Sequence, residues 1–207
     1  MYTGIVHGAY TVTKIRRRPG LNSLSLTLPA VLLEGLDIGA SVGIDGVCMT
    51  VTSIDGALVS FDAMQQTLSL TTLGDLEEGQ YVNVERSAKQ GAEIGGHLIS
   101  GHVDATAELV AIEQPENNCT LRFKLPSDLM KYVFAKGFIG LHGCSLTVAE
   151  LEKTSGIMSV CLIPETLRST NLGRLGVGSR VNIEVDRQTQ AIVDTVERVL
   201  AERELQG

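Results

Sequence analysis

The strongest constraint on the fold of this chain is an internal duplication. The segment GVCMTVT at 46–52 returns as GCSLTVA at 143–149. The pattern TLxxTxLGxLxxGxxVNxE at 67–85 returns at 166–184 with every fixed letter kept. The first pair of motifs is offset by 97 residues and the second by 99. Solenoid repeats span roughly 20 to 50 residues, so each copy is expected to be a whole domain.

Composition narrows the class of protein. The 207 residues include 17 basic and 24 acidic side chains, a net charge of −7, which disfavours a nucleic-acid or anionic-membrane partner. The first residues have neither a basic start nor a long apolar run, so we expect no signal peptide, no membrane span and a cytoplasmic location. Four cysteines without a CxxC pair are expected to be free thiols.

Strand signals dominate both copies. Apolar and polar residues alternate at 10–15, 23–28, 49–54, 58–63 and 81–85 in the first copy, and at 104–112, 119–125, 145–151, 157–163 and 180–185 in the second. Short turns such as IDGA at 54–57 separate them. Five or six short strands per copy, without long helices between them, predict a small closed or nearly closed antiparallel barrel.

A few segments are expected to be helical. Residues 29–36 and 126–133 lie at matching positions of the two copies, and Ser127 and Asp128 are candidate N-caps of the second. The tail from Arg187 to about Glu204 has apolar residues at helical spacing and must pack on its own chain or on identical helices in an oligomer. The expected division is therefore 1–92, 93–186 and 187–207.

Aligned positions that differ in chemistry are candidate functional positions. Cys48 aligns with Ser145, and Ile5 aligns with His102. One interpretation is that two halves hold two copies of one ligand in different chemical roles. The alternative is drift after duplication, with the retained letters specifying barrel turns. Cys48 alone could be a packed core thiol, a nucleophile or a hydrogen-bond partner.

His97 and His102 form the only close pair of histidines in the sequence. On one regular strand a separation of five residues would point the two rings to opposite faces, and no third ligand is suitably spaced. We therefore expect no metal site. One of the two histidines is expected to carry protons or contact the ligand, because histidine titrates nearest neutrality.

Several long motifs together resemble the riboflavin synthase family of lumazine-binding proteins. They occur in order over nearly the whole chain: MYTGIV, GVCMTVT, GGHLISGHVDATA, KGFIGLHGCSLTV, LIPETL and NIEVDRQTQAIVDTVERVLA. The resemblance implies a mainly β chain of two similar six-stranded antiparallel Greek-key barrels, related by internal duplication. A C-terminal amphipathic α-helix would follow and assemble three chains into a homotrimer.

The resemblance also implies a reaction. Two molecules of 6,7-dimethyl-8-ribityllumazine would dismutate to riboflavin and 5-amino-6-(ribitylamino)uracil, without metal or cofactor, in a site between subunits. The rival function is a non-catalytic lumazine- or flavin-binding protein on the same fold, like the antenna proteins of luminous bacteria. Both half-sites and the C-terminal helix are present in the sequence, which favours the enzyme.

Site residues follow from the same resemblance. In the first barrel the substrate contacts would be Gly4, Ile5, Val6, Cys48, Met49, Thr50, Asp62, Ala63, Met64, Gln65, Gln66 and Thr67. In the second barrel they would be Gly101, His102, Val103, Lys136, Ser145, Leu146, Thr147, Leu162, Ile163, Pro164, Glu165, Thr166 and Leu167. The polar groups for proton transfer or nucleophile activation would be Ser41, Cys48, His102, Ser145 and Asp186. A bound water or a ribityl hydroxyl is the alternative nucleophile.

One position departs from the family pattern. His142 stands where the family often has Asp or Asn, and its counterpart in the first copy is Asp45. One interpretation is a surface turn residue that is free to vary. The other is that His142 changes the proton inventory of the pocket.

Overall fold

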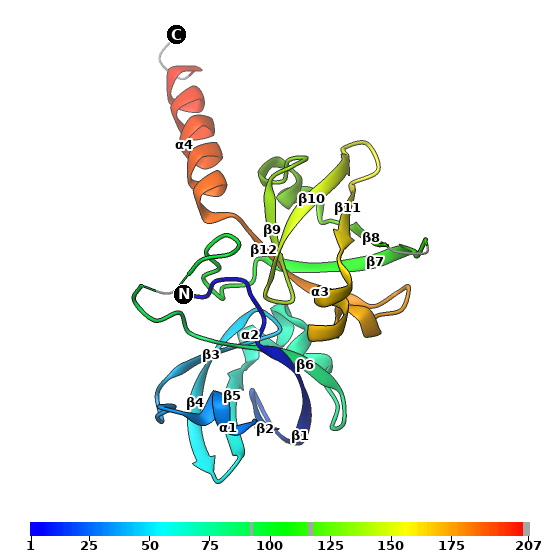
Figure 1. Cartoon of the computed structure of the whole chain (residues 1–207). Helices are drawn as coiled ribbons and strands as arrows, with labels where there is room; N and C mark the ends of the chain where they lie inside the picture. Colours follow the sequence, from blue (N-terminus) through cyan, green and yellow to red (C-terminus); the bar gives the residue numbers. More distant parts are fainter. Residues whose placement is uncertain (92, 116–117, 205–207) are drawn as a thin grey trace.

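The chain folds into two closed antiparallel barrels and a separate C-terminal helix (Figure 1). The structure is a computed structural model that describes residues 1–91, 93–115 and 118–204. Residue 92, the expected end of the first copy, and 205–207, the end of the expected tail, lie outside the described residues. The predicted fold class is confirmed.

The first barrel has the strand order β1-β2-β5-β4-β3-β6, and β6 closes it against β1. Because β6 lies beside β3 and the hairpins β3-β4-β5 follow in sequence, the order is a Greek key. Its strands are β1 (Gly8–Arg18), β2 (Leu21–Thr27), β3 (Ser41–Ile44), β4 (Val47–Asp55), β5 (Leu58–Met64) and β6 (Tyr81–Arg86). Alternation places Val59, Phe61 and Ala63 of β5 in the barrel core.

The second barrel repeats this order as β7-β8-β11-β10-β9-β12. Its strands are β7 (Ala105–Glu113), β8 (Cys119–Lys124), β9 (Phe138–Leu141), β10 (Cys144–Glu152), β11 (Ile157–Leu162) and β12 (Arg180–Val185). Each barrel encloses its own cluster of buried apolar side chains, which includes fully buried Phe61 in the first and fully buried Phe123 in the second. The hydrophobic effect therefore stabilises two cores rather than one.

Strand alternation missed one strand in each barrel. The missed strands, β3 and β9, are four residues long, and three of the four residues in each are buried. Gly43 and Gly140, at the positions that would otherwise alternate outward, are buried because Tyr2 packs over Gly43 and Ile99 packs over Gly140. Such short apolar segments show no period of two, so alternation could not identify them.

Helices inside the barrels are short. The expected helix at 29–36 is limited to α1 (Ala30–Leu33), and the one at 126–133 is a 3-10 helix, η2 (Ser127–Tyr132), whose N-terminus has no side-chain cap. Ser127 and Asp128 are therefore wrong as N-caps. Four further short helices were not predicted from the sequence: α2 (Gln65–Leu70), α3 (Pro164–Ser169), η1 (Thr72–Asp75) and η3 (Asn171–Arg174).

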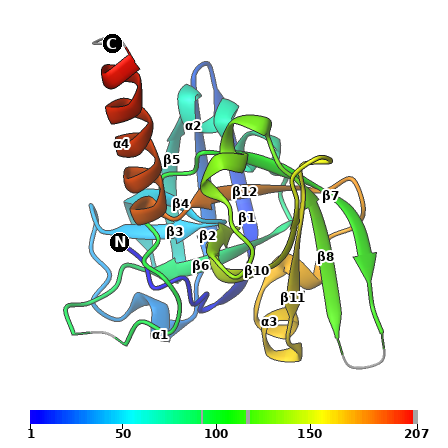
Figure 2. The same cartoon turned by 90° about the horizontal axis from the view of Figure 1, so that it is seen from above.

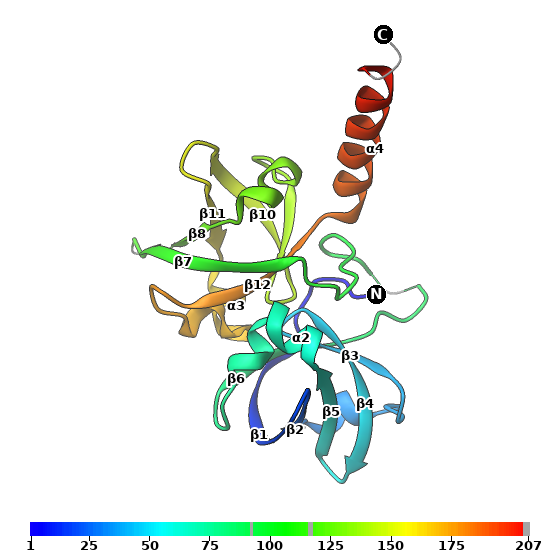
Figure 3. The ribbon, with the colours of Figure 1, turned by 180° about the vertical axis from the view of Figure 1, so that it is seen from behind.

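The tail forms α4 (Arg187–Glu204), which projects away from both barrels (Figures 1 and 3). Seen from above, the hairpin of β7 and β8 lies on the opposite side of the molecule from α4 (Figure 2). Tyr132 of η2 donates a hydrogen bond to Asp194, and Lys131 forms an ion pair with Glu197. One polar face of α4 is thus tied to its own barrel.

Two equivalent asparagines join the barrels. Asn83 of β6 donates from Nδ2 to the carbonyl of His142 at 2.9 Å, and Asn182 of β12 donates from Nδ2 to the carbonyl of Asp45 at 2.9 Å. Both asparagines are 1 % exposed. Because unpaired buried amides are costly, these reciprocal bonds define how the barrels sit on each other.

The amide oxygens complete the pattern. Asn83 Oδ1 accepts the N–H of Asn171 at 2.7 Å, and Asn182 Oδ1 accepts the N–H of Thr72 at 2.8 Å. Thr72 begins η1 and Asn171 begins η3. Each barrel therefore accepts a hydrogen bond from a backbone N–H at the N-terminus of a short helix of the other barrel. Because the two bonds are equivalent, the barrels are related by an approximate two-fold axis.

The turns before Gly46 and Gly143 meet at this axis. Asp45 and His142 have φ of 45° and 46°, and the glycines that follow have φ of 78° and 80°, as two-residue hairpin turns require. A Cβ on Gly46 would lie 2.6 Å from the nitrogen of Gly143. His142 is 3 % exposed. The expectation of a surface turn residue is wrong, because this turn is buried between the barrels.

Asp45 predicts a pH dependence of stability. Burial raises the pKa of its carboxyl, partly offset by the charge of His142 and by bonds from Asn83 and Asn171. The folded state therefore favours protonated Asp45, and the stability this contributes is lost as pH rises through the raised pKa. We expect Asp45→Asn, which keeps an acceptor oxygen, to become increasingly more stable than wild type as pH rises above the ordinary pKa of an aspartate, because wild type must then ionise a buried carboxyl.

Urea unfolding at fixed protein concentration measures this difference. The control is Asp37→Asn, because Asp37 is exposed. Identical pH slopes for wild type and Asp45→Asn would contradict the assignment.

Candidate functional site

Two segments cross between the barrels at the approximate two-fold axis. Tyr2 donates its N–H to the carbonyl of Ile99 at 2.8 Å, and Ile99 donates back to Tyr2 at 3.0 Å. This antiparallel bridge lies where residues 1–6 and 99–103 pass each other. The two segments occupy equivalent positions of the duplicated sequence, so each barrel receives one of them.

Each segment ends on the opposite barrel. The carbonyl of Gly4 accepts the N–H of Ser145 at 2.8 Å, and the carbonyl of Gly101 accepts the N–H of Cys48 at 2.8 Å. Val103 belongs to the first core, whereas Val6 packs against the second. The assignment of Gly4, Ile5 and Val6 to the first barrel, and of Gly101, His102 and Val103 to the second, is therefore wrong. The structure exchanges the two segments.

Glycine is required at both crossing points. Gly4 has φ of 75°, and a Cβ there would lie 2.4 Å from the Cβ of Ser145. Gly101 has φ of 84°, and its Cβ would lie 2.6 Å from the Cβ of Cys48. The left-handed backbone and the close approach both exclude a larger residue. The main chain thus runs directly over the two aligned polar side chains.

The second barrel has a cavity of about 290 Å³ at this crossing. It brings together segments that are far apart in sequence: Gly4, Ile5, Val6, Cys144, Ser145, Leu146, Ile163, Glu165, Thr166, Ser169 and Thr170. Sequence reasoning named eight of these residues and missed Cys144, Ser169 and Thr170. The last two lie at the end of α3, which the sequence analysis did not predict. We refer to this cavity as the candidate second half-site.

Other residues expected at the second half-site do not line this cavity. Leu162 is buried in the core, Leu167 packs against that core, and Pro164 begins α3. Thr147 is exposed on β10. Lys136 is exposed with φ of 69°, and its N–H bonds to the carbonyl of Val148.

The residues expected at the first half-site lie on the equivalent elements of the first barrel. Ser41 opposes Thr50 across β3 and β4, while Met49 and Ala63 point into the core. Asp62 accepts a hydrogen bond from Ser23 and lies 3.8 Å from Arg18. Met64, at the N-terminus of α2, is exposed, and Gln65, Gln66 and Thr67 form the first turns of that helix. The side chains of Met49 and Ala63 are therefore almost fully buried.

Cys48 and Ser145 have different hydrogen-bond partners. The Tyr2 hydroxyl donates to Cys48 Sγ at 3.2 Å. Ser145 Oγ lies 2.7 Å from Nδ1 of His97 and accepts the His97 backbone N–H at 3.0 Å. The structure thus adds Tyr2 and His97 to the site. Sequence reasoning considered His97 but did not select it, and no sequence pattern pairs it with Ser145.

His102 and Asp186 lie near the start of α4. The His102 side chain is exposed, and its carbonyl accepts a hydrogen bond from Arg187. Asp186 caps α4 by accepting bonds from Gln188 and Thr189. Burial opposes ionisation of Asp186, but the bonds from Thr189 and Gln188 and the nearby His97 hold its pKa below the usual value.

No regular strand carries His97 and His102, so the argument from strand geometry does not apply to them. Within residues 1–91, 93–115 and 118–204, no group of three or more His, Cys, Asp or Glu side chains is arranged to hold a metal ion. Across the same residues, no helix is long and apolar enough to span a membrane.

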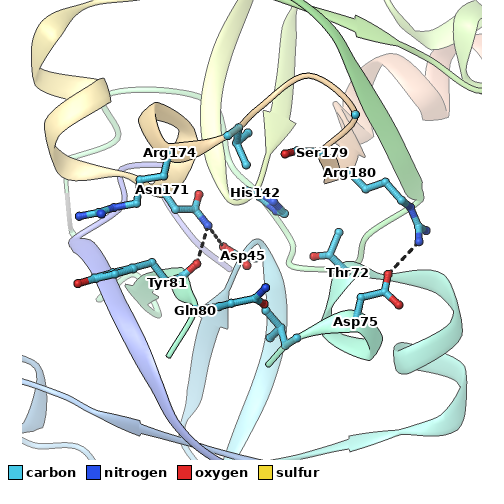
Figure 4. A pocket seen from close by; sticks show the side chains of 13 residues that line it. Asp45, Thr72, Asp75, Gln80, Tyr81, His142, Asn171, Arg174, Ser179 and Arg180 are labelled. Carbon is cyan, nitrogen blue, oxygen red and sulfur yellow. Dashed lines mark hydrogen bonds and ion pairs between the residues drawn. The ribbon is translucent and has the colours of Figure 1, made fainter. Parts of the chain in front are cut away.

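A larger cavity of about 510 Å³ lies between the barrels (Figure 4). Asp45 and His142 line its floor, Arg174 stacks on Tyr81 at 4.0 Å, and Arg180 pairs with Asp75 at 3.0 Å. None of the expected substrate contacts lines it. His142 therefore lies in the interface between the barrels, away from the half-site of Ser145.

Comparison with known proteins agrees with this geometry. The family model of the lumazine binding domain matches residues 3–87 and 100–186, one match per barrel. The chain is 54% identical to riboflavin synthase of Escherichia coli strain K12, over 99% of this chain and 95% of that protein. It is 42% identical to riboflavin synthase of Chlamydia pneumoniae, over 97% of this chain and 98% of that protein.

Solved structures of LumP share the fold. LumP complexed with riboflavin superposes with a TM-score of 0.84 at 30% identity, covering 90% of this chain and all of that one. LumP complexed with 6,7-dimethyl-8-(1'-D-ribityl) lumazine superposes with a TM-score of 0.81, also at 30% identity, covering 89% of this chain and 99% of that one. Together with the full-length relatives, these matches establish that the chain belongs to the riboflavin synthase family of lumazine-binding proteins.

Proposed function

We infer that this chain catalyses the formation of riboflavin from two molecules of 6,7-dimethyl-8-ribityllumazine, with 5-amino-6-(ribitylamino)uracil as the second product. The observation that carries this function is full-length identity of 54% to a riboflavin synthase. The presence of two equivalent but unequal half-sites in one chain supports it. One barrel presents a thiol where the other presents a hydroxyl.

The chemistry suits a duplicated site. A four-carbon unit passes from one lumazine to the other, and two substrate molecules contain all the atoms of the two products. One lumazine must lose a proton from its acidic C7 methyl group, and the other must accept nucleophilic addition. The protein's contribution is to hold two identical molecules in fixed orientation and to move protons.

We propose that each half-site binds one lumazine. The crossing segments supply backbone groups, Thr50 and Thr147 lie on equivalent strands, and the N-terminal turns of α2 and α3 close one side of each half-site. Cys48 and Ser145, with their partners Tyr2 and His97, are the groups nearest the crossing glycines. Ser41, His102 and Asp186 belong to the same proposal as further proton-transfer groups.

We also propose that residues 187–207 assemble the chain into a homotrimer, while 1–92 and 93–186 form the lumazine-binding units. Ile192, Val196 and Leu200 of α4 are 65 %, 51 % and 54 % exposed, an apolar stripe that its own barrel leaves uncovered. Exposed Met64 and Ile163 beside the half-sites support an active site that closes between subunits. A cytoplasmic location is part of this proposal.

The direct test is product formation. Purified protein mixed with the lumazine is expected to develop riboflavin absorbance in the presence of a metal chelator and without nucleotide or oxygen. The control is the same mixture without protein. Stable binding of lumazine with no riboflavin formed would contradict the enzyme and support a non-catalytic binding protein, the alternative that the likeness to LumP raises.

A mixing experiment tests whether the site lies between subunits. Thr50→Arg and Thr147→Arg put the same bulky group at equivalent exposed strand positions, so each variant should fold and lose activity. If a site pairs the first barrel of one chain with the second of its neighbour, co-assembled variants regain about a quarter of wild-type activity. A site within one chain would regain none, because every chain carries one blocked half. Singly purified variants mixed without reassembly are the control.

The stripe on α4 predicts the oligomeric state. Val196→Asp places a charge in the centre of the apolar stripe, so the trimer should dissociate because a buried unpaired charge is costly. Sedimentation measures the mass, and riboflavin formation should fall in parallel. Arg198→Asp, on the opposite face of the same helix, is the control and should remain trimeric. A trimeric Val196→Asp variant would contradict this role of α4.

A further inference from the structure

His97 is held in one position against Ser145. It is 9 % exposed, and its ring stacks on Phe138 with centroids 5.3 Å apart and planes 15° apart. A Cβ on the preceding Gly96 would lie 2.4 Å from Ser145 Oγ, so only glycine lets this segment run so close. The ring and backbone N–H of His97 therefore form a rigid unit with the Ser145 hydroxyl beside the second half-site.

The first barrel has no such unit at Cys48. Its partner is the phenol of Tyr2, and burial followed by the bond to Cys48 raises the pKa of Tyr2 far above its usual value. The protonated phenol donates its hydrogen to the sulfur, and it is not a base that could take a proton from Cys48 near neutral pH. In the second barrel Ile99 occupies the position equivalent to Tyr2, and it has no polar group to offer Ser145. His97 is thus the group that distinguishes the second half-site.

The imidazole is able to accept a proton. Burial lowers the pKa of His97, opposed by the carboxylate of Asp186, so the ring is neutral near pH 7. Asp186 at the start of α4 is the charged group that acts on it, and Phe138 and Ser145 are uncharged. Nε2 is buried without a hydrogen-bond partner among the residues that the structure describes. Nδ1, at 2.7 Å from Ser145 Oγ, is the atom through which the ring acts.

We propose that His97 is a positioning residue that draws the hydroxyl proton of Ser145 onto its Nδ1, so that Ser145 Oγ takes a proton from the lumazine in the second half-site. This rests on the proposed function. The C–H bond at the substrate breaks, an O–H bond forms at Ser145, and the original hydroxyl proton moves to His97 Nδ1. The charge of Asp186 stabilises the imidazolium, which returns the proton when the uracil product is released, so no other reactant is needed.

The test compares kcat against pH for wild type and His97→Asn. The Asn amide can stand where Nδ1 stands and bond Ser145, but it cannot titrate. We expect wild-type kcat to fall at acid pH as His97 protonates. The variant should lose that acid limb and about 100-fold in kcat, with KM changed less than about threefold. Unchanged riboflavin binding, measured by fluorescence, would show that the half-site is intact. A variant with the wild-type pH profile would overturn the proposal.

A second variant tests the proposal even if the His97→Asn protein does not fold. Asp186→Asn keeps an N-cap for α4 but removes the charge that raises the pKa of His97, so the acid limb should move to lower pH. An acid limb that stays in place would also overturn the role of His97. If the wild-type protein forms no riboflavin at all, the proposed function itself is refuted. Failure of the function can therefore be distinguished from failure of the role of His97.

Discussion

The reciprocal hydrogen bonds of Asn83 and Asn182 are the interaction on which the rest of the molecule depends. Each amide holds the turn carbonyl of the opposite barrel and satisfies a helix N-terminus there. All four bonds are buried, so separating the barrels would leave several polar groups unpaired. Because the bonds come in equivalent pairs, they impose the two-fold relation that lets residues 1–6 and 99–103 cross and reach opposite half-sites.

Duplication alone would give two identical pockets, and a reaction between two identical molecules needs two different ones. The structure shows the difference within a shared backbone. A glycine carbonyl accepts the N–H of Cys48 in one barrel and of Ser145 in the other. The side-chain partners differ: the Tyr2 phenol donates to Cys48, whereas the His97 imidazole can accept the proton of Ser145. The backbone therefore orients Cys48 and Ser145 in the same way, while their partners Tyr2 and His97 give the two half-sites different capacities for proton transfer.

The exposed apolar side chains have a common physical explanation. Those on α4 and those beside the half-sites would each lose contact with water if neighbouring chains packed on them. A ligand held in an open half-site would remain partly solvated, which weakens electrostatic control of proton transfer. Closure by a neighbouring barrel would exclude that water. Assembly and catalysis would then depend on the same burial of apolar surface.

Local patterns in the sequence were enough for the duplication, the β-rich class, most strands and the amphipathic tail, because alternation and helical spacing are read from neighbouring residues. They could not identify four-residue strands such as β3, nor the burial of His142. Only the tertiary structure places Gly4 and His97 in hydrogen-bond contact with Ser145, since these contacts join residues far apart in sequence. Two equivalent segments have equal local preference for either barrel, and only the packing of the barrels determines which one each segment reaches.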